Sequence, residues 1–171
     1  MAVRVIQPPE IEKTQESIIF LAGPIQGANN WQAEAIKTIR RITSGVTVAS
    51  PNKDYDEGTF VYEKQVDWET EYLKRAAQNG VVMFWLALQN DLGSPNDKGF
   101  YRAYAQTSRF ELGEMKIKHE RDGTKLVVGI EKGFGNERYI RRRFAQDCPD
   151  VPIHDDLEDT CRSAVKLIEE L

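Results

Sequence analysis

The sequence predicts an α/β fold with a roughly five-stranded parallel sheet and helices on both of its faces. Short apolar runs recur along the chain, a pattern typical of parallel strands that are buried on both faces. A segment with helical periodicity follows each run, as expected when helices connect parallel strands. The chain has 171 residues, of which 40% are hydrophobic and 29% charged. This length and composition predict one globular domain spanning residues 1–171.

Five short apolar runs are expected to form the strands. They comprise residues 17–22, 46–49, 81–86, 125–130 and, more briefly, 151–153. The run at 81–86 is the strongest of them and is expected at the centre of the sheet. Residues 1–16 are polar and contain Pro8-Pro9, so they are expected to form an irregular or edge segment.

The segments between these runs are expected to form helices. They cover about residues 30–42, 63–78, 108–119, 136–146 and the segment after Asp156, which is the expected cap of its helix. Asn79-Gly80 is a suitable end for the second helix. Residues 88–106 form an unusually long polar connection, and such loops in compact domains are usually functional or disordered.

The composition argues against several classes of function. A net charge of −4 gives no global electrostatic basis for binding nucleic acid or an anionic membrane. No apolar run approaches the roughly 20 residues that span a bilayer, and the N-terminus lacks a signal-peptide core. Cys148 and Cys161 are few and unclustered, which favours a reducing, cytoplasmic location. His119 and His154 are isolated in the sequence, so no metal site is expected.

Ligands of parallel α/β sheets bind outside the carboxyl ends of the strands. Four segments are expected to meet there: Gly23-Pro24, Pro51-Asn52, the loop after Trp85, and the start of the helix that carries Glu111. They are rich in carboxylates and aromatic residues, and they contain no Ser-His-Asp or Cys-His arrangement. Two carboxylates beside flat apolar rings suit the cleavage of a glycosidic bond to a nucleobase.

Glu111 has two interpretations from its local sequence. Ser108 and Glu111 fit the S-x-x-E capping box, in which each side chain bonds the backbone N–H of the other at a helix start. Alternatively, Glu111 is a catalytic carboxylate, followed closely by Gly113, which lets a ligand approach.

Four motifs carry a resemblance to a known family. They are Phe20-Leu21-Ala22-Gly23-Pro24-Ile25 followed by Trp31, Gln65-Val66-Asp67-Trp68-Glu69, Val82-Met83-Phe84-Trp85, and Phe110-Glu111-Leu112-Gly113-Glu114. In order and spacing, over about residues 18–130, they resemble the second, divergent branch of the nucleoside 2-deoxyribosyltransferase family. The E-L-G box after an A-G-P turn is the most specific combination.

The resemblance implies a flavodoxin-like three-layer sandwich and an enzyme that moves 2-deoxyribose from one nucleobase to another. The family needs no metal or organic cofactor. The glutamate of the E-L-G box, here Glu111, is the nucleophile and forms a deoxyribosyl ester that the incoming base attacks. The partners implied are 2-deoxynucleosides, free nucleobases and further copies of the chain, in a homo-oligomer with shared active sites. Phe100-Tyr101-Arg102-Ala103-Tyr104 would suit such an interface, or a lid.

The chain also departs from the family. Relatives typically carry an aspartate just before the central strand, where this chain has Asn79, which cannot serve as a general acid. Asp67 is therefore the expected second catalytic residue, with Glu69 behind it. Residues expected to contact substrate are Gly23, Pro24, Trp31, Asn52, Trp68, Glu69, Phe84, Trp85 and Ser108. Core packing is the alternative role for the aromatic residues among them.

Two alternatives to base exchange remain open. One is hydrolysis of nucleosides or their monophosphates on the same scaffold. A monophosphate would need a phosphate cradle, for which Ser108 is the only obvious candidate in the sequence, so unphosphorylated substrates are favoured. The other alternative is a non-catalytic nucleotide-binding domain in which Glu111 is only a helix cap.

Overall fold

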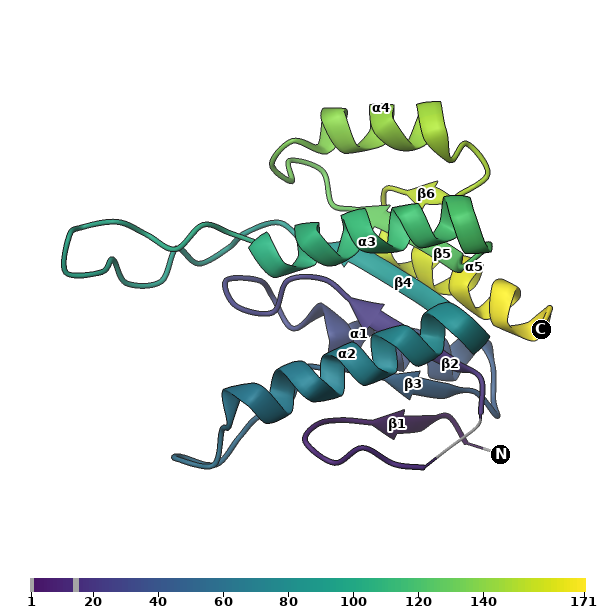
Figure 1. Cartoon of the computed structure of the whole chain (residues 1–171), viewed down its shortest axis with the longest axis horizontal. Coiled ribbons are helices and arrows are strands. Elements are labelled where there is room, and N and C mark those ends of the chain that lie inside the picture. Colours follow the sequence, from purple (N-terminus) through teal and green to yellow (C-terminus); the bar gives the residue numbers. More distant parts are fainter. Residues whose placement is uncertain (1, 14–15) are drawn as a thin grey trace.

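A computed structural model describes residues 2–13 and 16–171, so Met1, Thr14 and Gln15 of the expected N-terminal segment lie outside the described residues. Six parallel strands form one sheet in the order β1-β3-β2-β4-β5-β6 (Figure 1). The strands are β1 (Arg4–Ile6), β2 (Ile18–Ala22), β3 (Thr47–Ala49), β4 (Gly80–Leu86), β5 (Lys125–Ile130) and β6 (Ile153–His154).

Helices cover both faces of this sheet. They are α1 (Trp31–Ile42), α2 (Tyr62–Asn79), α3 (Gln106–Asp122), α4 (Glu137–Asp147) and α5 (Leu157–Glu169). The buried residues of α1 and α5 share one hydrophobic core, whereas those of α2, α3 and α4 share the other. The predicted flavodoxin-like three-layer sandwich is therefore confirmed.

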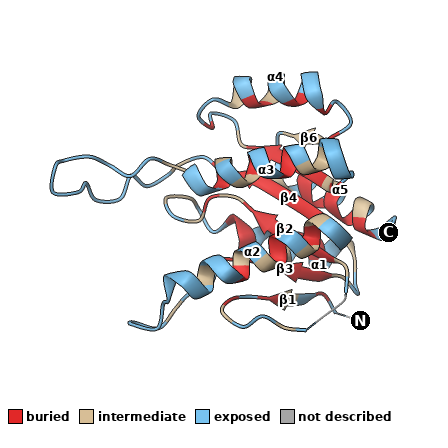
Figure 2. Cartoon of the chain, viewed as in Figure 1, coloured by how far each residue is buried: buried red, intermediate tan, exposed pale blue. Residues whose placement is uncertain are grey.

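The two cores follow from the alternation of side chains along the strands. In β4, Val82, Phe84 and Leu86 face α2 and α3, whereas Val81, Met83 and Trp85 face α1 and α5. All seven residues of β4 are buried, as expected for a central parallel strand. Figure 2 shows the buried residues concentrated in the sheet and on the inner faces of the helices.

Three details differ from the sequence prediction. Part of the segment predicted to be irregular or at an edge forms β1, which pairs with β3 as a sixth strand at one edge of the sheet. The last strand comprises residues 153–154 instead of 151–153. Helix α3 begins at Gln106, two residues before the predicted start, and Ala105 at its N-cap position has a left-handed conformation (φ 58°).

The strand order places a topological switch beside β2. From β2 the chain crosses to β3 on one side, and from β4 it crosses to β5 on the other. The connections after β2 and β4 therefore separate, leaving a crevice at their carboxyl ends. In Figure 1 the loop between β4 and α3 projects from this edge of the sheet.

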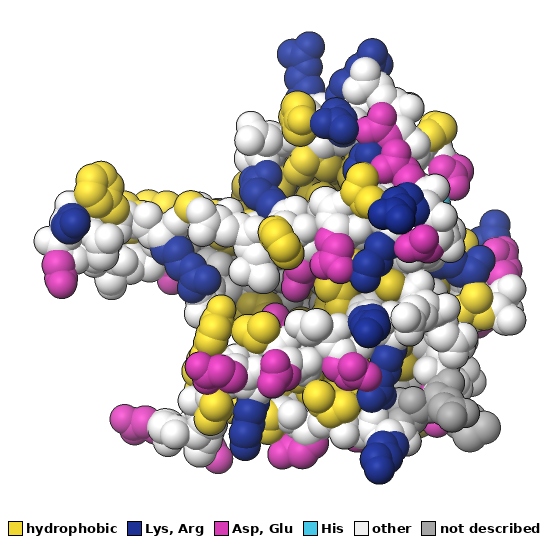
Figure 3. Space-filling model, viewed as in Figure 1, with side chains coloured by type: hydrophobic (Ala, Val, Ile, Leu, Met, Phe, Trp, Pro, Cys, Tyr) yellow, Lys and Arg dark blue, Asp and Glu magenta, His cyan; other side chains and the backbone are white. Residues whose placement is uncertain are grey.

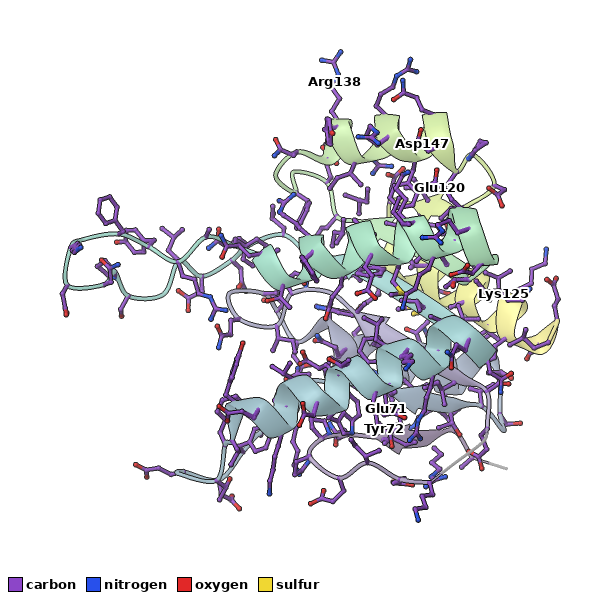
Figure 4. All side chains as sticks on the ribbon, in the orientation of Figure 1. Glu71, Tyr72, Glu120, Lys125, Arg138 and Asp147 are labelled. Atoms are coloured by element: carbon purple, nitrogen blue, oxygen red, sulfur yellow. The ribbon has the colours of Figure 1, made fainter. Side chains whose placement is uncertain are left out.

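An ion-pair cluster fixes the far end of α3. The ammonium of Lys116 lies 3.1 Å from a carboxylate oxygen of Glu120 and 2.8 Å from one of Asp147 in α4. Glu120 and Asp147 are labelled in Figure 4, where they lie on adjacent helices. This contact joins α3 to α4 at the end of the helix that is remote from Glu111.

Candidate active site at the carboxyl edge of the sheet

A cavity of about 960 Å³ lies at the switch point. Its walls come from the turn after β2, the segment after β3, the first half of α2, the loop before α3 and the first turns of α3. Figure 3 shows the surface hollowed between the projecting loop and the part of the molecule that carries α2. The volume suits a small-molecule ligand.

The turn after β2 forms one wall and depends on Gly23. Its φ of +150° is unfavourable for other residues, and a Cβ atom there would lie 2.2 Å from the carbonyl oxygen of Trp85. The indole N–H of Trp31 donates a hydrogen bond of 2.8 Å to the carbonyl of Pro24. Gly23 thus lets the turn pass close to β4, and the hydrogen bond from Trp31 holds the turn in this position.

Helix α2 contributes an oriented carboxylate, Glu69. The Gln65 amide donates to Glu69 Oε1 at 2.7 Å and to the carbonyl of Pro51 at 3.0 Å. The Gln65 carbonyl oxygen accepts a 2.5 Å hydrogen bond from the Tyr55 hydroxyl. Because its amide is engaged on both sides, Gln65 holds Glu69 in one orientation toward the cavity.

Helix α3 contributes Glu111 from its second turn. The helix has no acidic residue in its first turn and no side-chain cap, so the predicted capping box of Ser108 and Glu111 is wrong. The early start of α3 moves Ser108 to the third helical position, where its hydroxyl cannot act as the N-cap. Arg109 anchors this end of the helix by donating a 2.8 Å hydrogen bond to the carbonyl of Gly135.

Glu69 and Glu111 are electrostatically coupled. Burial raises the pKa of Glu111 to about 8, with further contributions from the negative charges of Glu69 and Glu114. Burial also raises the pKa of Glu69, although the hydrogen bond from Gln65 acts in the opposite direction. Near neutral pH the pair therefore retains one proton, which lies mainly on Glu111 because the pKa of that carboxyl is raised to about 8. When this proton moves to Glu69, the Glu111 carboxylate is ionised and Glu69 becomes the proton donor.

Some of the predicted site residues meet in this cavity and others do not. Those lining it are Gly23, Pro24, Asn52, Glu69, Ser108 and Glu111. Those outside its lining are Trp31, Asp67, Trp68, Phe84 and Trp85. The four aromatic residues of the second group are all buried in the two cores, where strand and helix periodicity points their side chains.

Asp67 does not occupy the position that the sequence analysis expected. It is exposed, and helical geometry places it on the side of α2 opposite to Gln65 and Glu69. Asn79 is not at the site either, because it ends α2 immediately before β4 begins, at the edge of the sheet remote from the cavity. The carboxylates that join Glu111 in the cavity lining are Glu69 and Asp91. Asp91 comes from the loop before α3 and accepts a 2.8 Å hydrogen bond from the Gly93 N–H, whereas Glu69 contributes to the raised pKa of Glu111.

The aromatic lining of the cavity includes three residues that were not predicted from the sequence, Tyr55, Phe60 and Tyr62. Phe20 of the first family motif and Tyr104 of the predicted interface or lid segment complete this lining. Tyr55 and Phe60 pack edge to face with ring centroids 5.3 Å apart. Their occurrence in an otherwise polar, turn-rich segment is the signal that could have identified them.

No family model matches the sequence, and no curated protein matches it. Within the described ranges, no three His, Cys, Asp or Glu side chains are grouped as a metal site would require. None of the helices in those ranges has both the length and the apolar character needed to cross a membrane.

Proposed function

We propose that this protein transfers 2-deoxyribose between nucleobases of 2-deoxynucleosides through a covalent ester on Glu111. The observation that carries the proposal is the coupled pair of glutamates in one aromatic-lined cavity. A buried carboxylate with a second carboxyl nearby is the arrangement used for nucleophilic cleavage of glycosidic bonds.

Each glutamate has a defined role in this mechanism. Glu111 reacts in the form of the pair in which the shared proton has moved to Glu69. Its carboxylate attacks C1′ of the sugar, and the C1′–N bond breaks as the base leaves with the proton of the Glu69 carboxyl. A second base then attacks C1′, breaks the ester and gives its N–H proton to the Glu69 carboxylate. Two inversions at C1′ give overall retention of configuration.

The surrounding residues support this division of roles. Glu69 is held by Gln65 and, through it, by Tyr55, so its carboxyl is oriented toward one side of the cavity. The side chains of Tyr55, Phe60 and Tyr62 form an aromatic rim near Glu69. Such rings provide flat apolar faces on which a nucleobase stacks.

Base exchange tests the proposal. The protein is incubated with a 2-deoxynucleoside and a different free base, and the products are separated by chromatography, with Glu111→Gln in parallel. A new deoxynucleoside from the wild type and none from the variant is expected. Release of free base and sugar alone would identify a hydrolase, and no reaction with any donor would contradict the proposal.

We also propose that the chain forms a homo-oligomer in which a second copy covers the open side of the cavity. The projecting loop carries exposed apolar residues near the cavity, including Leu92, Phe100 and Tyr101. On the opposite rim, Phe60 and Tyr62 are also more than half exposed. A monomeric mass in solution by light scattering would contradict this proposal.

A further inference from the structure

The N-terminus of α3 opens into the cavity without a cap. Gln106, Thr107 and Ser108 line the cavity, and their backbone N–H groups have no acceptor among the described residues. Ala105, at the N-cap position, has no side-chain oxygen with which to bond them. Three N–H donors and the positive end of a 17-residue helix therefore point at the ligand space.

Ser108 is a second, independent sign of a ligand at this position. Its side chain is 95% buried, since only 5% of the residue is exposed, and it lines the cavity. Its hydroxyl nevertheless has no hydrogen-bond partner in the described part of the chain, whereas other helical hydroxyls such as Thr160 bond a carbonyl one turn back. The Ser108 oxygen is not one of the fully enclosed unpaired polar atoms of the described residues, so it is reached from the cavity and is available to a bound group.

Two cationic side chains also line the cavity that the N-terminus of α3 and Ser108 face. Arg102 reaches the cavity from the loop before α3 and donates a hydrogen bond to Gln26 of the turn after β2. Lys53 lines the cavity from the segment after β3, with its ammonium 5.5 Å from the ring centre of Tyr55. Both are solvent-exposed and can move toward an anion, and arginine binds phosphate through two parallel hydrogen bonds.

The position of this anion site relative to Glu111 indicates what it binds. The residues with free N–H groups precede Glu111 by three to five positions on α3, and Ser108, on the same face, lies roughly 4.5 Å from Glu111 along the helix axis. That distance is comparable with the span of a deoxyribose ring between C1′ and the oxygen on C5′. A sugar with C1′ at Glu111 would thus place its 5′ substituent at the start of α3.

From this geometry we propose that the preferred sugar donor is a 2-deoxynucleoside 5′-monophosphate, with its phosphate bound by the start of α3, Ser108 and Arg102. The inference rests on the proposed function for the position of C1′. It revises the expectation of unphosphorylated substrates, because the uncapped helix start and the two cations near it are visible only in the structure.

The test compares a 2-deoxynucleoside with its own 5′-monophosphate as donor and measures kcat/KM for each. The wild type is expected to favour the monophosphate by at least about tenfold, the effect of one charge-assisted hydrogen bond or more. Ser108→Ala and Arg102→Ala are each expected to lower the ratio of the two kcat/KM values by about tenfold. A ratio below one, or a ratio unchanged in both variants, would overturn the proposal.

Arg138→Ala is the matched control for loss of a positive charge. Arg138 extends from α4 into solvent, away from the cavity (Figure 4). This variant is expected to keep the wild-type ratio. An equal fall of the ratio in Arg138→Ala and Arg102→Ala would show a general charge effect and contradict a local phosphate site.

A binding measurement separates failure of the phosphate site from failure of the chemistry. Calorimetry with Glu111→Gln compares the nucleoside, its 5′-monophosphate and inorganic phosphate. Tighter binding of the monophosphate by about tenfold is expected, with inorganic phosphate as a weak competitor. If no donor reacts but this preference holds, the proposed function fails and the phosphate site stands; equal affinities would overturn the site.

Discussion

Glu69 and Glu111 reach one cavity from two different helices, where burial and then the negative charge of Glu69 raise the pKa of Glu111. Neither residue would be strongly perturbed on the surface of an isolated helix. The coupling arises because α2 and α3 lie on the same face of the sheet, and because Gln65 turns the Glu69 carboxyl toward the cavity.

The pH dependence of base exchange should report loss of the shared proton. In the proposed mechanism Glu111 attacks as a carboxylate while Glu69 donates, so the active form carries one proton on the pair. Because the pKa of Glu111 is raised to about 8, we expect kcat/KM to fall above about pH 8. A donor whose base leaves as a stable anion should lack this alkaline fall. Activity that still increases above pH 9 with ordinary donors would contradict the assignment.

Glu111→Gln should stabilise the protein at alkaline pH. The pKa of Glu111 is raised from 4.5 in the fold, so its stabilising contribution is complete below about pH 4.5 and is lost as the pH rises through about 8. Glu111→Gln cannot lose this contribution. Its free energy of unfolding should therefore exceed that of the wild type by on the order of 2 kcal/mol at pH 9, and by much less at pH 5. Urea unfolding at both pH values measures the difference. An equal difference at both would mean that Glu111 does not titrate in this range.

Glu69→Gln and Asp67→Asn form a matched pair of neutralising substitutions on α2. Glu69→Gln removes the proposed proton donor. With a 2-deoxynucleoside whose base must be protonated to leave, it should lower kcat by about 10²- to 10⁴-fold, because general acid catalysis commonly accelerates a reaction by that factor. Asp67 is exposed and outside the cavity lining, so Asp67→Asn should change kcat by less than about twofold. A larger fall in kcat for Asp67→Asn than for Glu69→Gln would instead identify Asp67 as the second acid.

Gly23→Ala should destabilise the fold at the turn after β2. The added Cβ would lie 2.2 Å from a backbone carbonyl oxygen at a φ of +150°, so the turn or β4 must shift. We expect a loss of about 2–4 kcal/mol. Gly123→Ala is the control, because Gly123 also has a positive φ (+73°) but no atom within 4 Å of the added Cβ, and should cost about 1 kcal/mol. Similar losses in thermal or urea unfolding would exclude close approach as the cause.

The sequence was sufficient for the layers of the fold because buried parallel strands and amphipathic helices have distinct periodicities. It was not sufficient for β1, a three-residue edge strand whose pairing with β3 depends on a contact distant in sequence. The start of α3 was also missed. The Ser108 and Glu111 spacing matches a capping box, but the helix begins at Gln106, so Ser108 is its third residue and not its cap.

At the site, the strand ends and Glu111 could be located from local motifs, whereas the second carboxylate could not be chosen between Asp67 and Glu69. That choice depends on the rotation of α2 about its axis, which packing of Trp68 and Tyr72 against the sheet determines. The buried aromatic residues Trp31 and Trp85 resemble stacking platforms in sequence, yet they fill the core. The exposed Phe60 and Tyr62 lie at the cavity instead.

Mass spectrometry of the covalent intermediate tests the central claim most directly. The wild type is mixed with a donor in the absence of any acceptor base, quenched in acid and digested. We predict that one deoxyribosyl group, phosphorylated if the donor is, is attached to Glu111 and is absent from Glu111→Gln. Attachment to Glu69, or unmodified protein while exchange proceeds, would contradict Glu111 as the nucleophile.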